Sequence, residues 1–419
     1  MSDIDPPLTR PTLPPPAADP QHLRPRGSSQ GGLRQFNERV VLQAIRLHGA
    51  LPGAEIARQT QLTAQTISLI TKRLLDDGLL LKGEPQRGKV GQPSVPLALN
   101  PDGAYAVGIK VGRRSVDVLL VDFTGAVRER WSLDYRYPEP RQLLAEIRRR
   151  LDDIRKLLSP AARERVQGIG LAMPLSLGGW QTLLDMPPEV AARWPATDLR
   201  AEVAALGDWP VHLLKDTAAA CVAELVAGRG RSTPSFLYVF VDTFIGGGLV
   251  IDSHLRAGLH GNAGAIGSLP LARSDTKGAA PPQLLSVASL NNLERLYQAA
   301  GLDISAVADE RALLAPWAPV TRAWLADAGA AIAFAVNACA CLLDLDCVIV
   351  DGSFSRALQA ALLDAVEHAL AGYSWEGVNR PRLQPGTIGS DARAIGGALL
   401  PLHANFSPDR DLFLKIAVE

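Results

Sequence analysis

Short polar side chains between residues 63 and 72 have the chemistry needed to read the edges of DNA bases. A glutamine amide makes a paired hydrogen bond to adenine, serine and threonine hydroxyls bind bases or phosphates, and a lysine attracts phosphates. If residues 64 to 77 form a helix, these side chains share the face opposite its apolar residues. The predicted DNA contacts here are Thr63, Gln65, Thr66, Ser68, Thr71 and Lys72.

A cationic, glycine-rich segment follows at residues 86 to 93. Its composition is typical of the tip of a hairpin that reaches phosphates or the minor groove. We therefore predict further DNA contacts from Arg87, Lys89 and Gln92.

The surrounding pattern predicts a winged helix-turn-helix over residues 33 to 100. Apolar residues at three-and-four spacing predict helices at 34 to 48, 53 to 60 and 64 to 77, and Thr63 stands where the third helix needs an N-cap. Two wing strands are predicted at 79 to 82 and 94 to 99. Some three-helix clusters with a hairpin bind protein instead, but the order of N-cap, polar face and basic tip favours DNA.

The charge balance supports nucleic-acid binding by this module alone. The chain of 419 residues carries 43 Lys and Arg against 43 Asp and Glu, so no general affinity for polyanions follows. Between residues 34 and 91, however, nine cations outnumber five anions. Because so small an excess gives weak binding from one copy, we expect a homodimer or tetramer on a palindromic operator in double-stranded DNA.

Residues 1 to 32 are rich in Pro, Ser and Gly and predict a disordered leader. The leader lacks the basic-then-apolar order of a signal peptide, and we find no uninterrupted apolar run long enough to span a bilayer. These observations predict a soluble, cytoplasmic protein. The cysteines lie in apolar stretches without paired metal-ligand spacing, which predicts buried, reduced thiols and no metal site. They are Cys221, Cys339, Cys341 and Cys347.

Beyond residue 100, strands alternate with helices in two similar cycles. In the first, strands are predicted at 105 to 112, 116 to 123, 127 to 135, 166 to 172 and 211 to 214, with helices at 140 to 158, up to about 206, and at 216 to 227. In the second, strands are predicted at 235 to 242, 247 to 251 and 346 to 351, with helices at 284 to 300, 317 to 343, 356 to 371 and 392 to 404. Two cycles predict two α/β lobes, 101 to 230 and 231 to 419, with a cleft between them and the last helix packing back on the first lobe.

Five short segments of this body stand in an order typical of one protein family. They are Trp194-Pro195, Leu214 to Ala220, Ile245 to Leu249, Gly258 to Ser268 and Ala392 to Ala398. In this ordered set the chain resembles the ROK family, which groups bacterial sugar kinases with transcriptional repressors of sugar metabolism. The N-terminal module resembles the family's repressors, although Gln92 stands where the family usually has Arg. The resemblance implies an α+β multidomain chain, with a winged helix-turn-helix followed by a bilobed actin-like ATPase (ribonuclease H-like) α/β fold.

Compared with the family's kinases, the loops that would hold ATP carry larger or charged side chains. The resemblance implies glycines or a magnesium-binding carboxylate where this chain has Lys110 to Arg114, and glycines at Asp242, Phe244 and Asp351 to Ser353. Backbone must approach phosphate closely at such loops. We therefore expect no ATP cofactor and no enzymatic activity.

The resemblance also bears on the sugar site. Asp216 matches the family's general base, but its usual Asn neighbour is Lys215, and the family's Glu and His are Ala265 and Ser268. A further family Glu is Leu285, and residues 274 to 282 contain neither the cysteines nor the histidine of the family's zinc motif. Ordinary glucose-like recognition is therefore not expected.

The cleft can still be a binding site. Lys110, Lys215 and Arg113 or Arg114 would suit an anionic effector such as a sugar acid or sugar phosphate. The alternative, which we favour, is that Lys215 pairs with Asp216 and that the arginines are solvated turn residues. The candidate effector-binding residues are Lys110, Lys215, Asp216, Asn262 and Ser268.

Three functions remain open at this point. The first is a transcriptional regulator, a repressor of carbohydrate metabolism or transport genes, whose kinase-like body binds a sugar, polyol or sugar-acid effector and oligomerises. The second is an active carbohydrate kinase fused to a DNA-binding module, which Asp216 alone favours. The third is a scaffold for dimerisation or a partner protein, with no small ligand.

Overall fold

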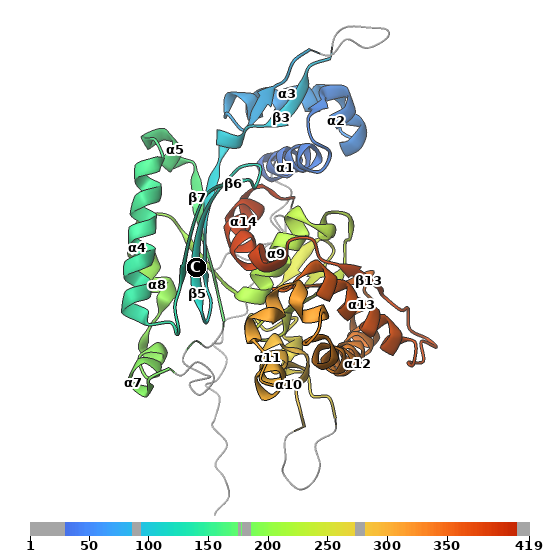
Figure 1. The fold of residues 1–419 in the computed structure, drawn as a ribbon. Helices are drawn as coiled ribbons and strands as arrows, with labels where there is room; N and C mark the ends of the chain where they lie inside the picture. Colours follow the sequence, from blue (N-terminus) through green and yellow to red (C-terminus); the bar gives the residue numbers. More distant parts are fainter. Residues whose placement is uncertain (1–29, 86–93, 175–176, 178–185, 273–280, 409–419) are drawn as a thin grey trace, which may run out of the picture.

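Three β-sheets organise the part of the chain that the structure describes, and helices cover both faces of the two larger ones (Figure 1). The computed structural model describes residues 30 to 85, 94 to 174, 177, 186 to 272 and 281 to 408. The predicted leader up to residue 29, the predicted contacts Arg87, Lys89 and Gln92, and most of the segment from 274 to 282 lie outside these residues.

The N-terminal module contains helices α1 (Gln30–His48), α2 (Gly53–Thr60) and α3 (Ala64–Asp76). Its antiparallel sheet has the order β1-β3-β2, with β1 at Leu51–Pro52, β2 at Leu80–Lys82 and β3 at Pro96–Leu99. Helix α2 has the predicted bounds, whereas α1 begins earlier than predicted, so residues 30 to 32 are helical and do not belong to a leader. Strand β1 was not predicted, because two residues are too few to show the alternation of apolar and polar residues that indicates a strand.

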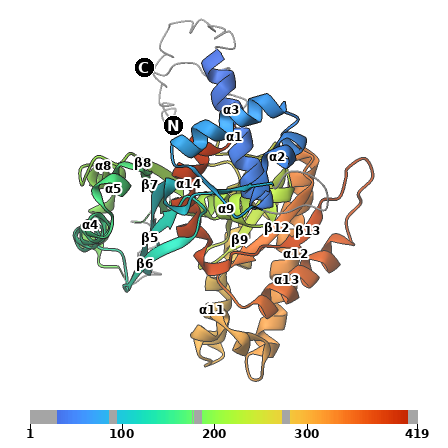
Figure 2. The same ribbon diagram turned by 90° about the horizontal axis from the view of Figure 1, so that it is seen from above.

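The module packs directly on the body of the chain. Val41 and Ile45 of α1 share one apolar core with Val121 of the first large sheet, with Phe123 directly after that strand, and with Leu402 of the C-terminal helix. Figure 2 shows α1 crossing above the body. Because burial of apolar surface is the main favourable contribution to association, this shared core fixes how the module sits on the body.

The first large sheet has the order β6-β5-β4-β7-β8. Its strands are β4 (Tyr105–Val111), β5 (Ser115–Asp122), β6 (Val127–Asp134), β7 (Val166–Met173) and β8 (Val211–Lys215). Strands β4, β5 and β6 are antiparallel neighbours, and β4, β7 and β8 are parallel. One face is covered by α4 (Pro140–Leu157), with α5 (Pro160–Glu164), α7 (Pro188–Ala191) and α8 (Leu199–Ala204) nearby (Figure 1).

The second large sheet has the order β11-β10-β9-β12-β13. Its strands are β9 (Phe236–Val241), β10 (Gly246–Ile251), β11 (His254–Arg256), β12 (Cys347–Gly352) and β13 (Arg382–Pro385). Helices α10 (Leu284–Ala288), α11 (Leu290–Ala299), α12 (Ala318–Leu343) and α13 (Arg356–Leu370) share a core with one face. Helix α9 (Asp216–Ala227) packs on the other face. The sequence missed the short edge strands β11 and β13.

Helix α14 (Ala392–Phe406) lies between the two large sheets, against α9 on one side and β4 and β7 on the other (Figure 1). Two glycines permit this close approach. A Cβ atom placed on Gly396 would lie 1.6 Å from the carbonyl oxygen of Ala219, and one placed on Gly170 would lie 1.8 Å from that of Gly397. Because the obstructing atoms are backbone, a larger residue must displace α14 from its neighbours.

We therefore expect Gly396→Ala to destabilise the protein although alanine favours helices. Forcing an extra carbon into a packed interior costs about 1 to 3 kcal/mol, which exceeds the gain of up to about 1 kcal/mol in helix propensity. Urea unfolding measures the difference. Gly372→Ala is the matched control, because a Cβ there would lie 3.4 Å from its nearest neighbour. Equal stability of the two variants would show that α14 does not pack this closely.

Helix α12 is long and apolar enough to cross a bilayer by length and composition, although Asp327 and Asn337 interrupt its apolar run. Its residues Trp324, Ile332 and Val336 are buried in the core, which accounts for its composition. Of the four free cysteines, Cys221 and Cys347 are buried as predicted, but Cys339 is half-buried and Cys341 is exposed.

Candidate functional site

Helix α3 presents a polar face whose start is held by its own side chains. The backbone amide of Thr66 donates to Oγ1 of Thr63 at 3.1 Å, so Thr63 is the N-cap, as predicted. The hydroxyls of Thr63 and Thr66 also bond to each other at 2.9 Å. Just before the cap, Gln61 has a φ of 58°, the left-handed conformation that ends α2 and turns the chain into α3. These bonds fix where the exposed face of α3 begins.

Beyond this cap, Gln65, Ser68 and Lys72 are exposed, whereas Thr71 is not. Thr71 is only 8% exposed, and its hydroxyl donates to the carbonyl oxygen of Ile67 at 2.8 Å. The prediction that Thr71 contacts DNA was therefore wrong. A threonine whose hydroxyl bonds to the preceding turn presents little polarity and can be buried beside isoleucine.

Leu69, which was not among the predicted DNA contacts, also lies on this face. Its side chain is 62% exposed, and it stands four residues after Gln65 and three before Lys72. The spacing of residues 65, 68, 69 and 72 already indicates one helical stripe. An exposed leucine here can contact the methyl group of thymine, which is also read by apolar contact.

A second group of charged residues lies where the first sheet, β9 and α14 meet. Arg393, from the first turn of α14, forms an ion pair with Asp242, and its Nη1 lies 4.0 Å from Oδ2 of Asp216. Burial alone would raise the pKa of Asp242, but the charges of Arg393 and Lys110 outweigh it and lower that pKa. Sequence reasoning missed Arg393, because its partners are far away in the chain.

Lys110 is committed to a partner on the neighbouring strand. Its Nζ donates to Oδ2 of Asp117 at 3.0 Å and to Oγ of Ser115 at 2.5 Å. Burial and the nearby charge of Arg393 lower the pKa of Lys110, while Asp117 opposes that shift. Because its charge is already neutralised, Lys110 is a poor candidate for an effector contact.

The two arginines of the β4–β5 turn contact the second half of the body. The guanidinium carbon of Arg113 lies 4.5 Å from the centre of the Phe244 ring, and Arg114 forms a 3.7 Å ion pair with Glu294 of α11. Arg113 is half-buried, and burial lowers its pKa although Asp216 and Asp242 oppose the shift. The interpretation of Arg113 as a solvated turn residue was therefore wrong.

Lys215 and Asp216 stand together at the start of α9. Oδ1 of Asp216 accepts the backbone N–H of Thr217 at 2.9 Å. Lys215 is half-buried, and burial lowers its pKa while the charge of Asp216 raises it. Among the described residues Lys215 forms no ion pair within 4.0 Å, so Asp216 faces Arg393 instead of pairing with Lys215 as expected.

Asp351, near the end of β12, is bonded to three neighbouring residues. It is fully buried, and its carboxylate accepts the backbone N–H groups of Gly352 at 3.0 Å and Gly389 at 2.7 Å. Arg356 donates to the same carboxylate at 3.1 Å. These bonds hold the end of β12 against Gly389 and the start of α13.

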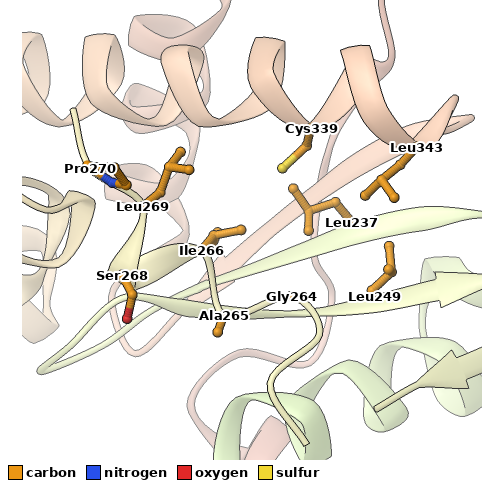
Figure 3. Close-up of a pocket in the computed structure, with 10 residues that line it drawn as sticks. All are labelled: Leu237, Leu249, Gly264, Ala265, Ile266, Ser268, Leu269, Pro270, Cys339 and Leu343. Atoms are coloured by element: carbon orange, nitrogen blue, oxygen red, sulfur yellow. The ribbon is translucent and has the colours of Figure 1, made fainter. Parts of the chain in front are cut away.

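The remaining candidates, Asn262 and Ser268, are exposed, and no contact in the described part of the chain joins them to Asp216. Ser268 borders a hollow of about 350 Å³ beneath α12 (Figure 3). In Figure 3 its hydroxyl points away from the apolar side chains that meet there, among them Leu237, Ile266 and Leu343. Because these walls are mainly apolar, they offer few partners for sugar hydroxyls.

Comparison with known proteins places this geometry in a family. Residues 106 to 404 match the profile of the ROK family. The xylose repressor of Bacillus subtilis is 24% identical over 249 residues, which are 58% of this chain and 62% of the repressor. The chain thus spans about three-fifths of the length of this curated relative.

Two solved structures share the fold. A ROK family transcriptional regulator, described as a homologue of the Escherichia coli MLC protein, has a TM-score of 0.64 at 20% identity, covering 90% of this chain and 97% of that one. A ROK hexokinase from Thermus thermophilus has a TM-score of 0.53 at 21% identity, covering 70% and 97%. The body therefore has the bilobed actin-like fold, and the chain belongs to the ROK family.

Proposed function

We propose that this protein is a sequence-specific DNA-binding regulator, a repressor of carbohydrate metabolism or transport genes that works in the cytoplasm. The observation that carries the proposal is the capped helix α3, whose exposed stripe of Gln65, Ser68, Leu69 and Lys72 stands clear of the body. The three helices and small sheet have the composition and order of a winged helix-turn-helix, in which α3 enters the major groove. The relative named a xylose repressor supports a sugar-linked role.

The ATP loops argue against the kinase alternative. Side chains fill three places where a kinase needs backbone that is accessible to ATP. They are Arg113 on the Phe244 ring, the ion pair of Arg393 with Asp242, and the hydrogen-bonded Asp351. The body then serves to bind an effector and to oligomerise. Buried Nε atoms of Arg113 and Arg393 lack hydrogen-bond partners among the described residues, which favours a polar effector near Asp216.

A ligand-free scaffold is the second candidate, because the pair between Arg393 and Asp242 neutralises the cleft without any ligand. A thermal-shift screen of sugars, polyols and sugar acids separates it from the sensor. Under the sensor proposal at least one compound raises the melting temperature, and Asp216→Asn removes the effect.

The operator tests the proposed function. We expect footprinting to reveal an inverted repeat whose half-sites are about 10 base pairs apart or a multiple of that, because a dimer places two recognition helices in grooves on one side of the duplex. A single unpaired half-site would contradict the dimeric arrangement, and no protected site in any genomic fragment would contradict the function itself.

We expect neither ATP binding nor sugar phosphorylation. Calorimetric titration of ATP should show no saturable heat, and coupled assays over a panel of sugars should show no ATP consumption, because ATP would have to displace Phe244 and the Arg393 ion pair. Asp216→Asn is the matched variant and should behave like the wild type in these assays. Sugar-dependent ATP consumption that this variant abolishes would restore the kinase alternative.

A further inference from the structure

A second hollow, of about 260 Å³, lies where the N-terminal module meets the body. Helix α1 contributes Gln43 and Arg46, the turn after α9 contributes Arg231, and the start of β11 contributes His254. His403 and Ser407, at the end of α14, complete the wall. Figure 2 shows α1 lying across α14 and α9 at this junction. Any molecule held here touches the module and the body at once.

Two guanidinium groups face each other in this hollow. Arg231 donates through Nη2 to the carbonyl oxygens of Arg46 and Leu47, at 3.0 and 2.8 Å, and so caps the C-terminal end of α1. Arg46 donates through Nη1 to the carbonyl oxygen of Phe123 at 3.1 Å and lies over the Phe123 ring. Each bond uses one terminal nitrogen, so both groups keep N–H donors for another partner.

The charge of these groups is poorly compensated. No Asp or Glu is among the described residues that line the hollow. Burial and the charge of Arg231 lower the pKa of Arg46 to about 10, and Asp122 only partly opposes that shift. The wall therefore brings positive charges close together, and a bound anion would reduce the repulsion between them.

We propose that this hollow binds a small phosphate-type dianion, either free phosphate or a phosphate monoester of a small molecule. Guanidinium groups match phosphate oxygens with paired, charge-assisted hydrogen bonds, and the amide of Gln43 adds a neutral donor. The hydroxyl of Ser407 is hydrogen-bonded to Nδ1 of His403 at 2.7 Å. The volume suits a phosphate with a small organic group. The site is separate from the cleft around Asp216, since it lies on the module side of α9 and α14.

The location gives the anion a consequence for DNA binding, which rests on the proposed function. Because residues from α1 and from the body both line the site, an anion binds well only when the module is docked as in this structure. An effector shifts a conformational equilibrium by its difference in affinity for the two states. Phosphate should therefore stabilise the docked arrangement and change the affinity for the operator.

Calorimetry on the full chain tests the site without DNA. Inorganic phosphate and glycerol 3-phosphate should bind with one saturable site, whereas glycerol and chloride at equal ionic strength should not. Arg231→Gln should weaken binding about tenfold or more, because it removes a charge-assisted bond. Arg229→Gln is the matched control, since Arg229 lies in the same turn but does not line the hollow. Absence of saturable binding, or equal affinity in all variants, overturns the proposal.

A measurement on the wild type guards against unfolded variants. Phosphate should slow hydrogen exchange of backbone amides at the C-terminal end of α1 and in the turn after α9, and leave those of α12 unchanged. Slower exchange at other amides instead of these would contradict the proposed position of the site. In gel shifts, unchanged operator affinity with bound phosphate would overturn the coupling alone. Phosphate binding by a chain that binds no DNA would contradict the proposed function and leave the site standing.

Discussion

Replacing Arg393 with methionine should destabilise the protein by about 3 to 5 kcal/mol, the usual cost of removing one partner from a buried ion pair. The side chains of Arg393 and Asp242 are only 12% and 17% exposed, so water screens the remaining charge weakly. Without the arginine, Asp242 loses its partner and Asp216 loses its nearest guanidinium. Denaturant unfolding of the variant and wild type at pH 7 measures the cost.

A double-mutant cycle separates the ion pair from simple loss of packing. Asp242→Asn combined with Arg393→Met should cost clearly less than the sum of the single changes, because the coupling between the two partners is counted in each single variant. Additive losses would mean that Arg393 contributes by packing alone.

The pH dependence gives an independent check with a defined sign. The folded-state pKa of Asp242 lies below its ordinary value of 3.8, because Arg393 and Lys110 outweigh the effect of burial. A carboxylate with a depressed pKa stabilises the folded state above its unfolded pKa, and this stabilisation is lost as the pH falls through the folded pKa. The stability difference between wild type and Arg393→Met should therefore be greatest near neutral pH and shrink below about pH 4. A difference independent of pH would contradict the assignment.

Local signals predicted many elements well. Helix α9 begins at Asp216 and ends at Ala227, and α2 spans residues 53 to 60, both as predicted. The ordered segments also led to the ROK family, which the match over residues 106 to 404 confirms. Such features depend on neighbours within a few turns of chain, which the sequence displays directly.

The features that sequence missed depend on distant partners or on partial burial. Arg393 gains its role from Asp242 and Asp216, which a one-dimensional pattern cannot bring together. Thr71 was assigned to the polar face by residue type, although its hydroxyl is satisfied within the helix. Leu69 was passed over for the converse reason, because an apolar residue was not expected on an exposed stripe. The sequence therefore predicted the helix that bears the candidate DNA contacts. It could not predict the electrostatic contacts of the cleft.

The sharpest test of that helix is Gln65→Ala, which should weaken operator binding about five- to 150-fold, equivalent to about 1 to 3 kcal/mol for a paired contact to one base. Gln65 is exposed one residue inside the start of α3, where recognition helices contact base edges. Binding to a scrambled duplex should stay unchanged, because a base contact carries no affinity for the phosphate backbone.

Lys72→Ala is the matched control on the same stripe. Removing a lysine that contacts phosphate should weaken binding to both duplexes alike. It should also lower the number of counterions released on binding, which the salt dependence of the affinity measures, by about one. Mobility shifts on the operator and the scrambled duplex at two salt concentrations distinguish the two roles. Equal losses on both duplexes for Gln65→Ala would remove Gln65 from base recognition, and no loss for either variant would mean that α3 does not face the DNA.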